Sequence, residues 1–291
     1  MSAGVGIMNE GFRAACVIGW PAGHSRSPLI HNYWIKRHGL TAEYRREAVP
    51  PDKFAEFVAT LGERGYIGAN VTLPHKEAAL ALSDPDDRAR AVGAANTLWF
   101  EGGKLRSTNT DVEGCIENLD AAAPRWDAGL QSAIVLGAGG AARAVVFALL
   151  DRGVGRVAVS NRTFEKAEAL RERFGKRVHP VRWEEINGLL AGAQLLVNAT
   201  SLGMSGQPGL DVNVENLPRT AVVADIVYVP LETPLLAAAK KRGLRTADGL
   251  GMLLHQAVRG FSLWFGVRPE VTAELRSLVE ADLKTGATAE R

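Results

Sequence analysis

Short apolar runs alternate with polar stretches rich in glycine, proline and serine along this chain. Continuous apolar runs of this length are typical of strands buried on both faces of a parallel sheet. They predict strands at residues 14–19, 67–71, 132–136, 157–160, 195–198 and 221–227, and the more polar segment 44–49 is also predicted to be a strand. Helices are predicted between them at 27–39, 52–61, 74–82, 140–150 and 233–243, with a final pair from residue 248 that is interrupted near 266–269. This alternation predicts an α/β protein with largely parallel sheets.

Two segments depart from this alternation. Residues 97–100 and 105–107 read as an antiparallel hairpin around Gly102-Gly103, because paired glycines suit a tight hairpin turn. Residues 121–129 include Pro124 and Gly129 and are predicted to form a surface connection between two domains.

The stretch from Asn70 to Lys76 carries the first candidate chemistry. Its proline at position 74 suits the first position of a helix, with Thr72 or Leu73 as the cap. Lys76 then falls in the first turn, where the helix dipole disfavours an ammonium and favours release of its proton. Lys76 is therefore a candidate general acid/base, although a lone lysine is more often a solvated surface residue.

Ser25 and Ser27 lie in a glycine-, proline- and serine-rich loop before a predicted helix. Ser27 precedes Pro28 and can serve as a helix cap. Two hydroxyl groups before a helix N-terminus can also hold a carboxylate, and the sequence leaves both interpretations open.

Asp111 ends a polar run, 108–111, that precedes an amphipathic stretch. Taken alone, Asp111 reads as a cap or first-turn acid of a helix. Gln256, near the start of the penultimate helix, would as an isolated residue be expected on a solvated face.

The run after the strand at 132–136 is a nucleotide-binding pattern. It places Gly137, Ala138, Gly139, Gly140, Ala141 and Ala142 between that strand and a helix, with a second strand at 157–160. This is the dinucleotide fingerprint with a small residue in its third position, and its flanking elements make the match strong.

The residues after the second strand of this unit predict which dinucleotide binds. A site for NAD usually places Asp or Glu there to bind the ribose 2′-hydroxyl. Here the strand ends in Asn161, Arg162 and Thr163, with Lys166 one turn later. Arg162 can stack on adenine and reach a 2′-phosphate, Thr163 can donate a hydrogen bond and Lys166 adds charge, so we predict NADP. The polar run from Asn198 to Met204, which includes Thr200, stands where another cofactor-binding loop belongs.

Composition narrows the class of protein. The chain has 291 residues, enough for two domains, with 46% hydrophobic and 23% charged residues. A net charge of +2 gives no reason to expect nucleic acid or a membrane surface as a partner. No apolar run reaches the length of a membrane span, and Met1 to Gly11 lack the pattern of a secretory signal. Cys16 and Cys115 form no metal-type pair, so we expect no metal site and a reducing cytoplasm.

Together, these motifs resemble the shikimate dehydrogenase family over most of the chain. The matching residues are Pro21, His24 to Pro28, His31-Asn32, 70–76, 93–98, 109–111, 137–142, 161–163, 198–203, Tyr228 and 249–256. The resemblance implies an N-terminal α/β substrate domain and an inserted, doubly wound NADP domain of Rossmann type. The expected boundaries are 1–112 with 249–291 for the substrate domain and 113–248 for the NADP domain.

The resemblance also implies roles for individual residues. Lys76 and Asp111 would form the catalytic pair. Ser25, Ser27 and Tyr228 would hold the substrate carboxylate, while Thr72, Asn96 and Gln256, with Asp111, would bind ring hydroxyls or order the site. Gly137 to Ala141, Asn161 to Thr163, Lys166, Thr200 and Gly249 would bind the cofactor. His24 and His75 are expected to have loop or packing roles, and His31 and Asn32 to support the loop.

The implied reaction is reversible reduction of 3-dehydroshikimate to shikimate with NADPH, by a monomer or a homodimer. One alternative is a quinate/shikimate dehydrogenase that uses NAD or both cofactors. The missing acid at 161–163 argues against it, as does Ser27, where relatives that use quinate tend to carry threonine. A non-catalytic NADP-sensing protein is a second alternative, but it would not need both Lys76 and Asp111.

Overall fold

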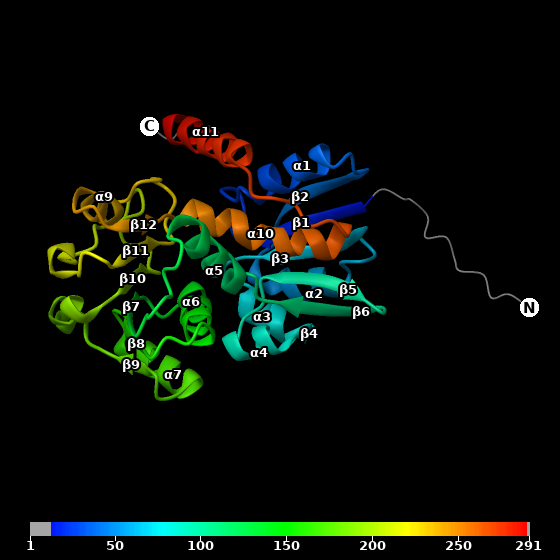
Figure 1. The fold of residues 1–291 in the computed structure, drawn as a ribbon. Coiled ribbons are helices and arrows are strands. Elements are labelled where there is room, and N and C mark those ends of the chain that lie inside the picture. Colours follow the sequence, from blue (N-terminus) through cyan, green and yellow to red (C-terminus); the bar gives the residue numbers. More distant parts are fainter. Residues whose placement is uncertain (1–12, 290–291) are drawn as a thin grey trace, which may run out of the picture.

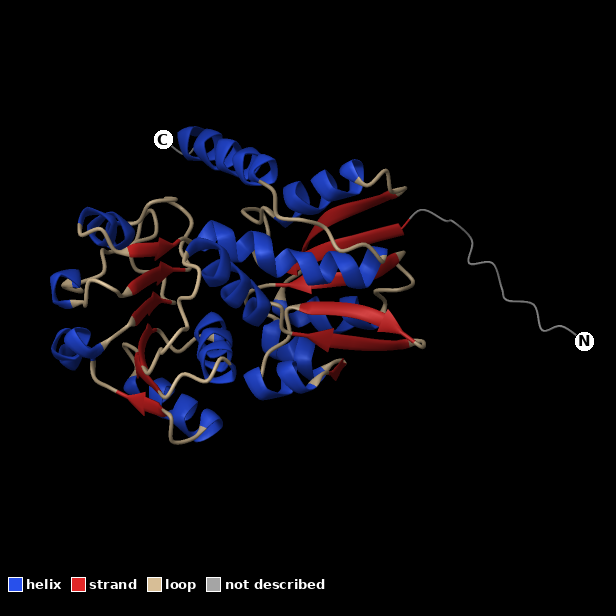
Figure 2. Cartoon of the chain, in the orientation of Figure 1, coloured by secondary structure: helices blue, strands red, loops and turns tan. Residues whose placement is uncertain are grey.

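Two six-stranded sheets, each flanked by helices, lie side by side in the computed structural model (Figures 1 and 2). The structure describes residues 13–289, with side chains as far as residue 285. The expectation about a secretory signal concerns Met1 to Gly11, which lie outside the described residues. Within the described chain, no helix combines the length and apolar character needed to cross a membrane.

The first sheet is mixed rather than wholly parallel. In spatial order its strands are β2 (Ala42–Ala48), β1 (Arg13–Gly19), β3 (Tyr66–Val71), β5 (Thr97–Glu101), β6 (Lys104–Thr108) and β4 (Asp84–Pro85). The predicted hairpin is confirmed: β5 pairs antiparallel with both β3 and β6, around a turn in which Gly102 and Gly103 have positive φ. In central strand β1, Ala15 and Val17 face one core and Cys16 and Ile18 the other, as expected for a strand covered on both sides.

The second sheet is entirely parallel. Its spatial order is β12 (Arg245–Ala247), β11 (Val222–Asp225), β10 (Leu195–Asn198), β7 (Ser132–Leu136), β8 (Arg156–Ser160) and β9 (Val178–Pro180). The strand order reverses between β7 and β10, which is the doubly wound arrangement predicted from the sequence. Ligands of such sheets bind beyond the carboxyl ends of the strands at this reversal.

Helices cover both faces of each sheet. The α-helices are α1 (Ser27–Arg37), α2 (Phe54–Ala59), α3 (Lys76–Ala81), α4 (Asp87–Val92), α5 (Asp111–Ala122), α6 (Gly140–Asp151), α7 (Phe164–Phe174), α8 (Ile186–Leu189), α9 (Pro234–Lys241), α10 (Gly249–Phe265) and α11 (Ala273–Ala289). The short 3₁₀ helices are η1 (Pro51–Lys53), η2 (Trp183–Glu185), η3 (Leu190–Gly192) and η4 (Val214–Asn216).

Two helices carry the chain between the sheets. α5 leads from the first sheet to the second and packs into the core formed by α6 and one face of that second sheet. α10 returns and packs on β3 and β5 of the first sheet as well as along α5 (Figure 1). The predicted surface connection at 121–129 is partly wrong, because Ala123 and Trp126 are buried in the core beneath α5.

Candidate active site

Lys76 and Asp111 meet between the two sheets. Lys76 is the first residue of α3 and Asp111 the first of α5. The Nζ atom of Lys76 lies 2.5 Å from Oδ2 of Asp111, and the two side chains are only 17% and 12% exposed. The structure thus joins two residues 35 positions apart in sequence into one ion pair. A shielded ammonium held by a carboxylate can give up and recover a proton at a fixed point.

Asn96 fixes the orientation of the Asp111 carboxylate. Its Nδ2 donates to Oδ1 of Asp111 at 2.8 Å. Its Oδ1 accepts from the backbone N–H of Thr110 at 2.7 Å and from the hydroxyls of Thr97 and Thr110 at 3.1 and 3.2 Å. Every polar atom of this buried side chain is therefore engaged, which holds the amide in one orientation.

A chain of buried hydrogen bonds continues from Asn96 toward the serine loop. Asn70 donates from Nδ2 to Oγ1 of Thr97 at 3.1 Å and accepts from the Tyr44 hydroxyl at 2.7 Å. Burial raises the pKa of Tyr44 well above its ordinary value, so the phenol stays a neutral donor. Ser27, which is buried, is a further hydrogen-bonding neighbour of that phenol. The predicted substrate loop and the Lys76–Asp111 pair therefore belong to one polar network.

Ser25 and Ser27 have different roles in the loop, and neither caps α1. α1 begins at Ser27, and Ser27 makes no side-chain cap. Instead, Oγ of Ser25 accepts from the backbone N–H of Ser27 at 3.3 Å. The Ser25 carbonyl in turn accepts from Arg46 at 2.7 Å. Of the two interpretations left open for Ser27, capping is therefore wrong, because the helix starts one residue earlier than a Ser27 cap allows. The Ser27 hydroxyl is left for other partners.

The start of the lysine helix also differs from the prediction. Pro74 precedes α3, follows a cis peptide bond and is not its first residue. The residue at the cap position is His75, and neither Thr72 nor Leu73 caps the helix. His75 instead stacks on Phe54, with ring centroids 4.3 Å apart, and its Nε2 lies 2.7 Å from the Val49 carbonyl. This confirms the expected packing role of His75. Lys76 is at the N-terminus of the helix, as predicted, although the helix begins two residues later than expected.

Gln256 contacts the network directly, whereas Thr72 and Tyr228 lie in the segments that follow β3 and β11. Gln256 on α10 is 9% exposed, and its Oε1 accepts from Thr110 Oγ1 at 3.4 Å. Half-buried Thr72 follows β3, and its backbone N–H donates to Ile18 at 2.9 Å. Tyr228 follows β11 of the second sheet but packs against the core of the first. Burial raises the pKa of Tyr228, with the charge of Arg26 opposing the shift, so its hydroxyl is kept as a donor beside the serine loop.

The glycine-rich loop after β7 has the space that a pyrophosphate needs. At Gly137 φ is +106°, and a Cβ there would lie 2.7 Å from the Ala199 carbonyl oxygen, so only glycine fits. A Cβ at Gly139 or Gly140 would meet nothing within 4 Å, so the loop is open at the N-terminus of α6. Ala142 is fully buried against the sheet. These features fit a dinucleotide phosphate at this helix terminus.

The predicted 2′-phosphate residues lie at the carboxyl end of β8. Nδ2 of Asn161 donates to the Thr163 carbonyl at 2.8 Å and braces the turn into α7. The side chains of Arg162, Thr163 and Lys166 are exposed. No carboxylate stands at the end of the strand, which agrees with room for a phosphate rather than a ribose hydroxyl pair.

Thr200 and Gly249, both predicted to bind the cofactor, also have structural roles within the protein. The Thr200 hydroxyl donates to Oδ1 of Asn198 at 2.7 Å and accepts from the Leu202 N–H at 3.0 Å. A Cβ at Gly249 would lie 2.2 Å from the Ile226 carbonyl oxygen, so this glycine lets α10 approach the end of β11. Asp225, which sequence reasoning missed, anchors the same corner by accepting from Asn198, Val227 and Thr233. Burial raises the pKa of Asp225.

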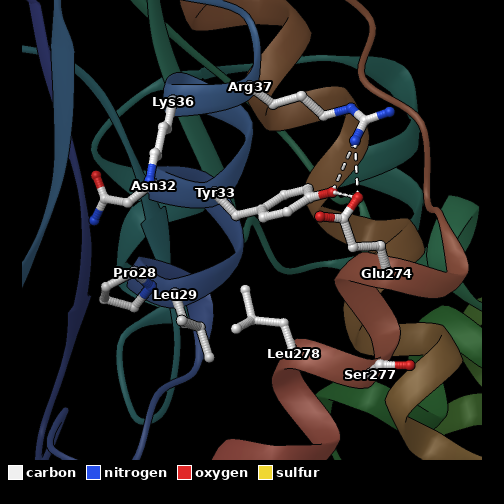
Figure 3. Close-up of a pocket in the computed structure, with 9 residues that line it drawn as sticks. All are labelled: Pro28, Leu29, Asn32, Tyr33, Lys36, Arg37, Glu274, Ser277 and Leu278. Atoms are coloured by element: carbon white, nitrogen blue, oxygen red, sulfur yellow. Dashed lines mark hydrogen bonds and ion pairs between the residues drawn. The ribbon is translucent and has the colours of Figure 1, made fainter.

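A separate groove lies between α1 and α11, away from this network. It has a volume of about 990 Å³ and is lined by Pro28, Leu29, Asn32, Tyr33, Lys36, Arg37, Glu274, Ser277 and Leu278. Leu29 and Leu278 face each other across it, and Arg37, Tyr33 and Glu274 close one side through hydrogen bonds (Figure 3). None of the predicted site residues lines this groove.

Family models match most of the chain in three consecutive regions. Residues 17–98 match the shikimate dehydrogenase substrate binding domain. Residues 122–208 match the shikimate/quinate 5-dehydrogenase domain, and residues 249–273 the shikimate 5′-dehydrogenase C-terminal domain. These matches follow the order of the motifs recognised in the sequence.

Individual relatives and solved structures agree with these models. Proteins named shikimate dehydrogenase (NADP(+)) from Rhodopseudomonas palustris (strain TIE-1) and Nitrobacter winogradskyi are each 68% identical over 271 residues, which is 93% of this chain and 97% of theirs. A Thermus thermophilus shikimate 5-dehydrogenase, solved with NADP(H) and shikimate, is 36% identical, with a TM-score of 0.79 over 94% of this chain and 98% of that chain. A Corynebacterium glutamicum quinate dehydrogenase, solved with NAD, is 32% identical, with a TM-score of 0.85 over 93% and 100%. The sequence resemblance is thus confirmed, and the chain belongs to the shikimate dehydrogenase family.

Proposed function

We propose that the protein is an NADP-dependent shikimate dehydrogenase that interconverts 3-dehydroshikimate and shikimate. The observation that carries this proposal is the shielded Lys76–Asp111 pair, oriented by Asn96. Glu77, next to Lys76, pairs with Arg143 near the start of the dinucleotide-binding helix α6. Relatives at 63–68% identity bear the name of this enzyme and its NADP(+) cofactor.

The chain's residues divide into a substrate site and a cofactor site. We assign residues 1–112 and 249–291 to the substrate domain and 113–248 to the NADP domain. Ser25, Ser27 and Tyr228 would bind the substrate carboxylate, and Thr72, Asn96 and Gln256 its ring hydroxyls or the residues that order them. Gly137 to Ala141, Thr200 and Gly249 would hold the pyrophosphate and nicotinamide half, and Asn161, Arg162, Thr163 and Lys166 the adenosine 2′-phosphate.

Proton transfer is the part of the reaction that falls to the protein. When bound, NADPH supplies the hydride that reduces the carbonyl carbon. The carbonyl π electrons pass to the oxygen, and Lys76 donates a proton from Nζ to that oxygen and becomes a neutral amine. In the reverse direction the amine accepts the hydroxyl proton. Asp111 holds the ammonium in place through the 2.5 Å contact.

Exclusion of water and the choice of compartment complete the proposal. Closure of the two domains over the ligands would strengthen the electrostatic interactions during transfer.

The two cysteines of the described chain are buried and unpaired, which suits a reducing cytoplasm. We propose a monomer or a homodimer, a choice that light scattering of the purified protein decides.

A four-way absorbance assay tests the function. Purified protein is mixed with shikimate or quinate and with NADP or NAD, and reduced nicotinamide is followed by its absorbance. We expect the highest kcat/KM with shikimate and NADP. A higher kcat/KM with quinate, or equal efficiency with NAD, would favour the quinate/shikimate dehydrogenase alternative. The absence of turnover with all four pairs would refute the enzymatic proposal.

A further inference from the structure

Arg182 is brought to the 2′-phosphate region by strand register, although it lies twenty positions after Arg162 in the sequence. β8 and β9 are parallel and Val159 is aligned with Pro180. The backbone N–H of Val181 donates to the Val159 carbonyl at 2.9 Å, which extends the pairing beyond β9. If this register is continued by two residues, Arg182 is aligned with Asn161, the residue that follows β8. β8, β9 and α7 lie together at one edge of the second sheet (Figure 1).

The Arg182 side chain is turned toward the first turn of α7. Its guanidinium carbon lies 4.8 Å from the centroid of the Phe164 ring. Phe164 is the first residue of α7 and follows Thr163 directly. Lys166 belongs to the same turn. A guanidinium stacked on an aromatic ring is held by cation–π attraction while its N–H groups remain available at its edges.

Charge at this corner is left uncompensated. Within residues 13–289, the side chains of Arg162, Lys166 and Arg182 make no ion pair with a carboxylate. Glu185, three residues after Arg182, accepts from its backbone N–H at 2.8 Å rather than from its guanidinium. Several other arginines of the chain are paired, for example Arg152 with Asp120 and Asp127. Gathered cations without acidic partners favour a doubly charged anion such as a phosphate monoester.

We propose that Arg182 binds the 2′-phosphate of NADP together with Arg162 and Lys166, and that Phe164 is the positioning residue for its guanidinium. This inference rests on the proposed NADP function and deepens it, because it assigns part of the preference for NADP over NAD to a residue outside the fingerprint and the loop after β8. Arg182 would donate N–H groups to phosphate oxygens, while its flat face stays on the Phe164 ring.

Direct binding of nucleotide fragments separates a phosphate contact from a general effect. Isothermal titration calorimetry with adenosine 2′,5′-bisphosphate and with adenosine 5′-monophosphate measures the contribution of the 2′-phosphate without turnover. For Arg182→Ala we expect the dissociation constant of the bisphosphate to rise about tenfold, as for loss of one charge-assisted hydrogen bond, while that of the monophosphate stays within about twofold. Phe164→Leu should raise the dissociation constant of the bisphosphate by a smaller factor.

A matched control is available on the same helix. Arg171 is also exposed, but it lies seven residues beyond Phe164 in α7 and thus about 10 Å along its axis. Arg171→Ala removes the same charge and should leave both dissociation constants unchanged. Equal melting temperatures of the variants and the unaltered protein confirm that the altered proteins are folded.

Three results would overturn the inference. Bisphosphate affinity of Arg182→Ala equal to that of the unaltered protein would remove Arg182 from the site. An equal loss for both nucleotides would place Arg182 on the adenine or in the fold rather than on the phosphate. If the unaltered protein itself does not discriminate between the two nucleotides, the NADP assignment fails together with this one. By contrast, discrimination in Arg182→Ala as large as in the unaltered protein would refute only the role of Arg182.

Discussion

Asp111 is the residue on which the chemistry of the site converges. One carboxylate oxygen accepts from Lys76 and the other from Asn96, and Asn96 is held by three further donors. In a buried network each missing partner leaves another polar group unpaired, so the positions of Lys76 and Asp111 are over-determined. This is the rigidity that proton transfer at a fixed distance requires.

Replacement of Lys76 tests its role in proton transfer. We expect Lys76→Ala to lower kcat by about a hundredfold or more, with a smaller change in KM, because the proton donor acts mainly in the transition state. Steady-state kinetics with shikimate and NADP measure both constants. Lys104→Ala, on the exposed hairpin, is the control for loss of one lysine and should leave kcat unchanged. Near-normal turnover of Lys76→Ala would exclude the lysine from the chemistry.

His31 makes the stability of the protein depend on pH. It is completely buried among Tyr44, Trp34, Phe261 and Trp264, and burial lowers its pKa to about 3. Asn70 slightly opposes this shift, although within the described chain neither ring nitrogen makes a hydrogen bond that meets geometric criteria. The imidazole of the unfolded chain takes up a proton near pH 6.5, whereas the buried imidazole of the folded protein does not. The free energy of unfolding is therefore unaffected by protonation of His31 above pH 6.5 and falls as the pH is lowered below that value.

Substitution of His31 should remove this pH dependence. Between pH 7 and pH 5 the free energy of unfolding should fall by about 2 kcal/mol more in the unaltered protein than in His31→Phe, in which a ring can still stack on Tyr44. Urea unfolding at both pH values measures the difference. Exposed His38, changed to Gln, provides the control. Parallel losses of stability in His31→Phe and the unaltered protein would show that His31 does not remain neutral in the fold.

The sequence could identify the ends of the buried network but not its middle. Lys76, Asp111 and Ser27 belong to motifs with recognisable spacing. Tyr44 meets Asn70 only because β2, β1 and β3 are neighbours in the sheet. Asn70 opens the stretch that the sequence marks as candidate chemistry, but its own role as a link between Tyr44 and Thr97 is not visible there. Nothing local to Tyr44 signals that its hydroxyl faces the site.

At the scale of the element, strand cores were predicted well and helix starts poorly. β7, β10 and the hairpin follow directly from apolar runs and glycine pairs, which depend on neighbouring residues alone. The short strands β4, β9 and β12 were missed, because two or three residues carry no periodicity and form strands only through their neighbours. Pro74 misplaced the start of α3, since a proline fits the residue before a helix as well as its first position.

α11 contacts α1 and the serine loop that precedes it. Asp282 forms an ion pair with Arg26, between the two serines of the substrate loop, at 2.6 Å. At the other end of the helix, Glu274 binds Arg37 and Tyr33 of α1. The carboxyl-terminal helix therefore holds both ends of α1, and Asp282 is the residue that pairs with the serine loop through Arg26.

Loss of the Asp282 charge should loosen substrate binding selectively. Because this carboxylate is 44% exposed, the pair is worth at most about 1 kcal/mol, so Asp282→Asn should raise the KM for shikimate by about fivefold at most, with little change in kcat. Glu274→Gln, on the same helix, is the matched control and should leave that KM unaltered. Initial rates over a range of shikimate concentrations give both constants. Equal effects of the two substitutions would mean that α11 serves stability alone.

At the scale of the whole molecule, the two sheets are joined by more than the two helices that connect them. Arg143, in the first turns of α6, forms an ion pair with Glu77 of α3 and donates to the Gly93 carbonyl at 3.3 Å. Arg173 of α7 donates to the carbonyls of Ala91 and Arg90 at 3.0 and 3.3 Å. Gly93 has a φ of +74°, and a Cβ there would lie within 2.7 Å of the Arg173 guanidinium, so a side chain would disturb this contact. The cofactor half is thus fastened to the segment that carries Lys76.

The Arg143–Glu77 pair should couple cofactor position to catalysis, because it joins the helix after the glycine loop to the residue beside Lys76. Glu77 is 68% exposed, so the pair is weak, and we expect Arg143→Ala to lower kcat by about fivefold with little change in the affinity for shikimate. Glu77→Gln should lower kcat less, since Arg143 keeps its bond to Gly93. The double variant should be no slower than Arg143→Ala, because both changes break the same contact. Rate constants from the four proteins complete a double-mutant cycle at low and high salt. Independent, multiplicative losses would show that the two side chains act separately, and the contact between the domains would then have no part in setting the rate.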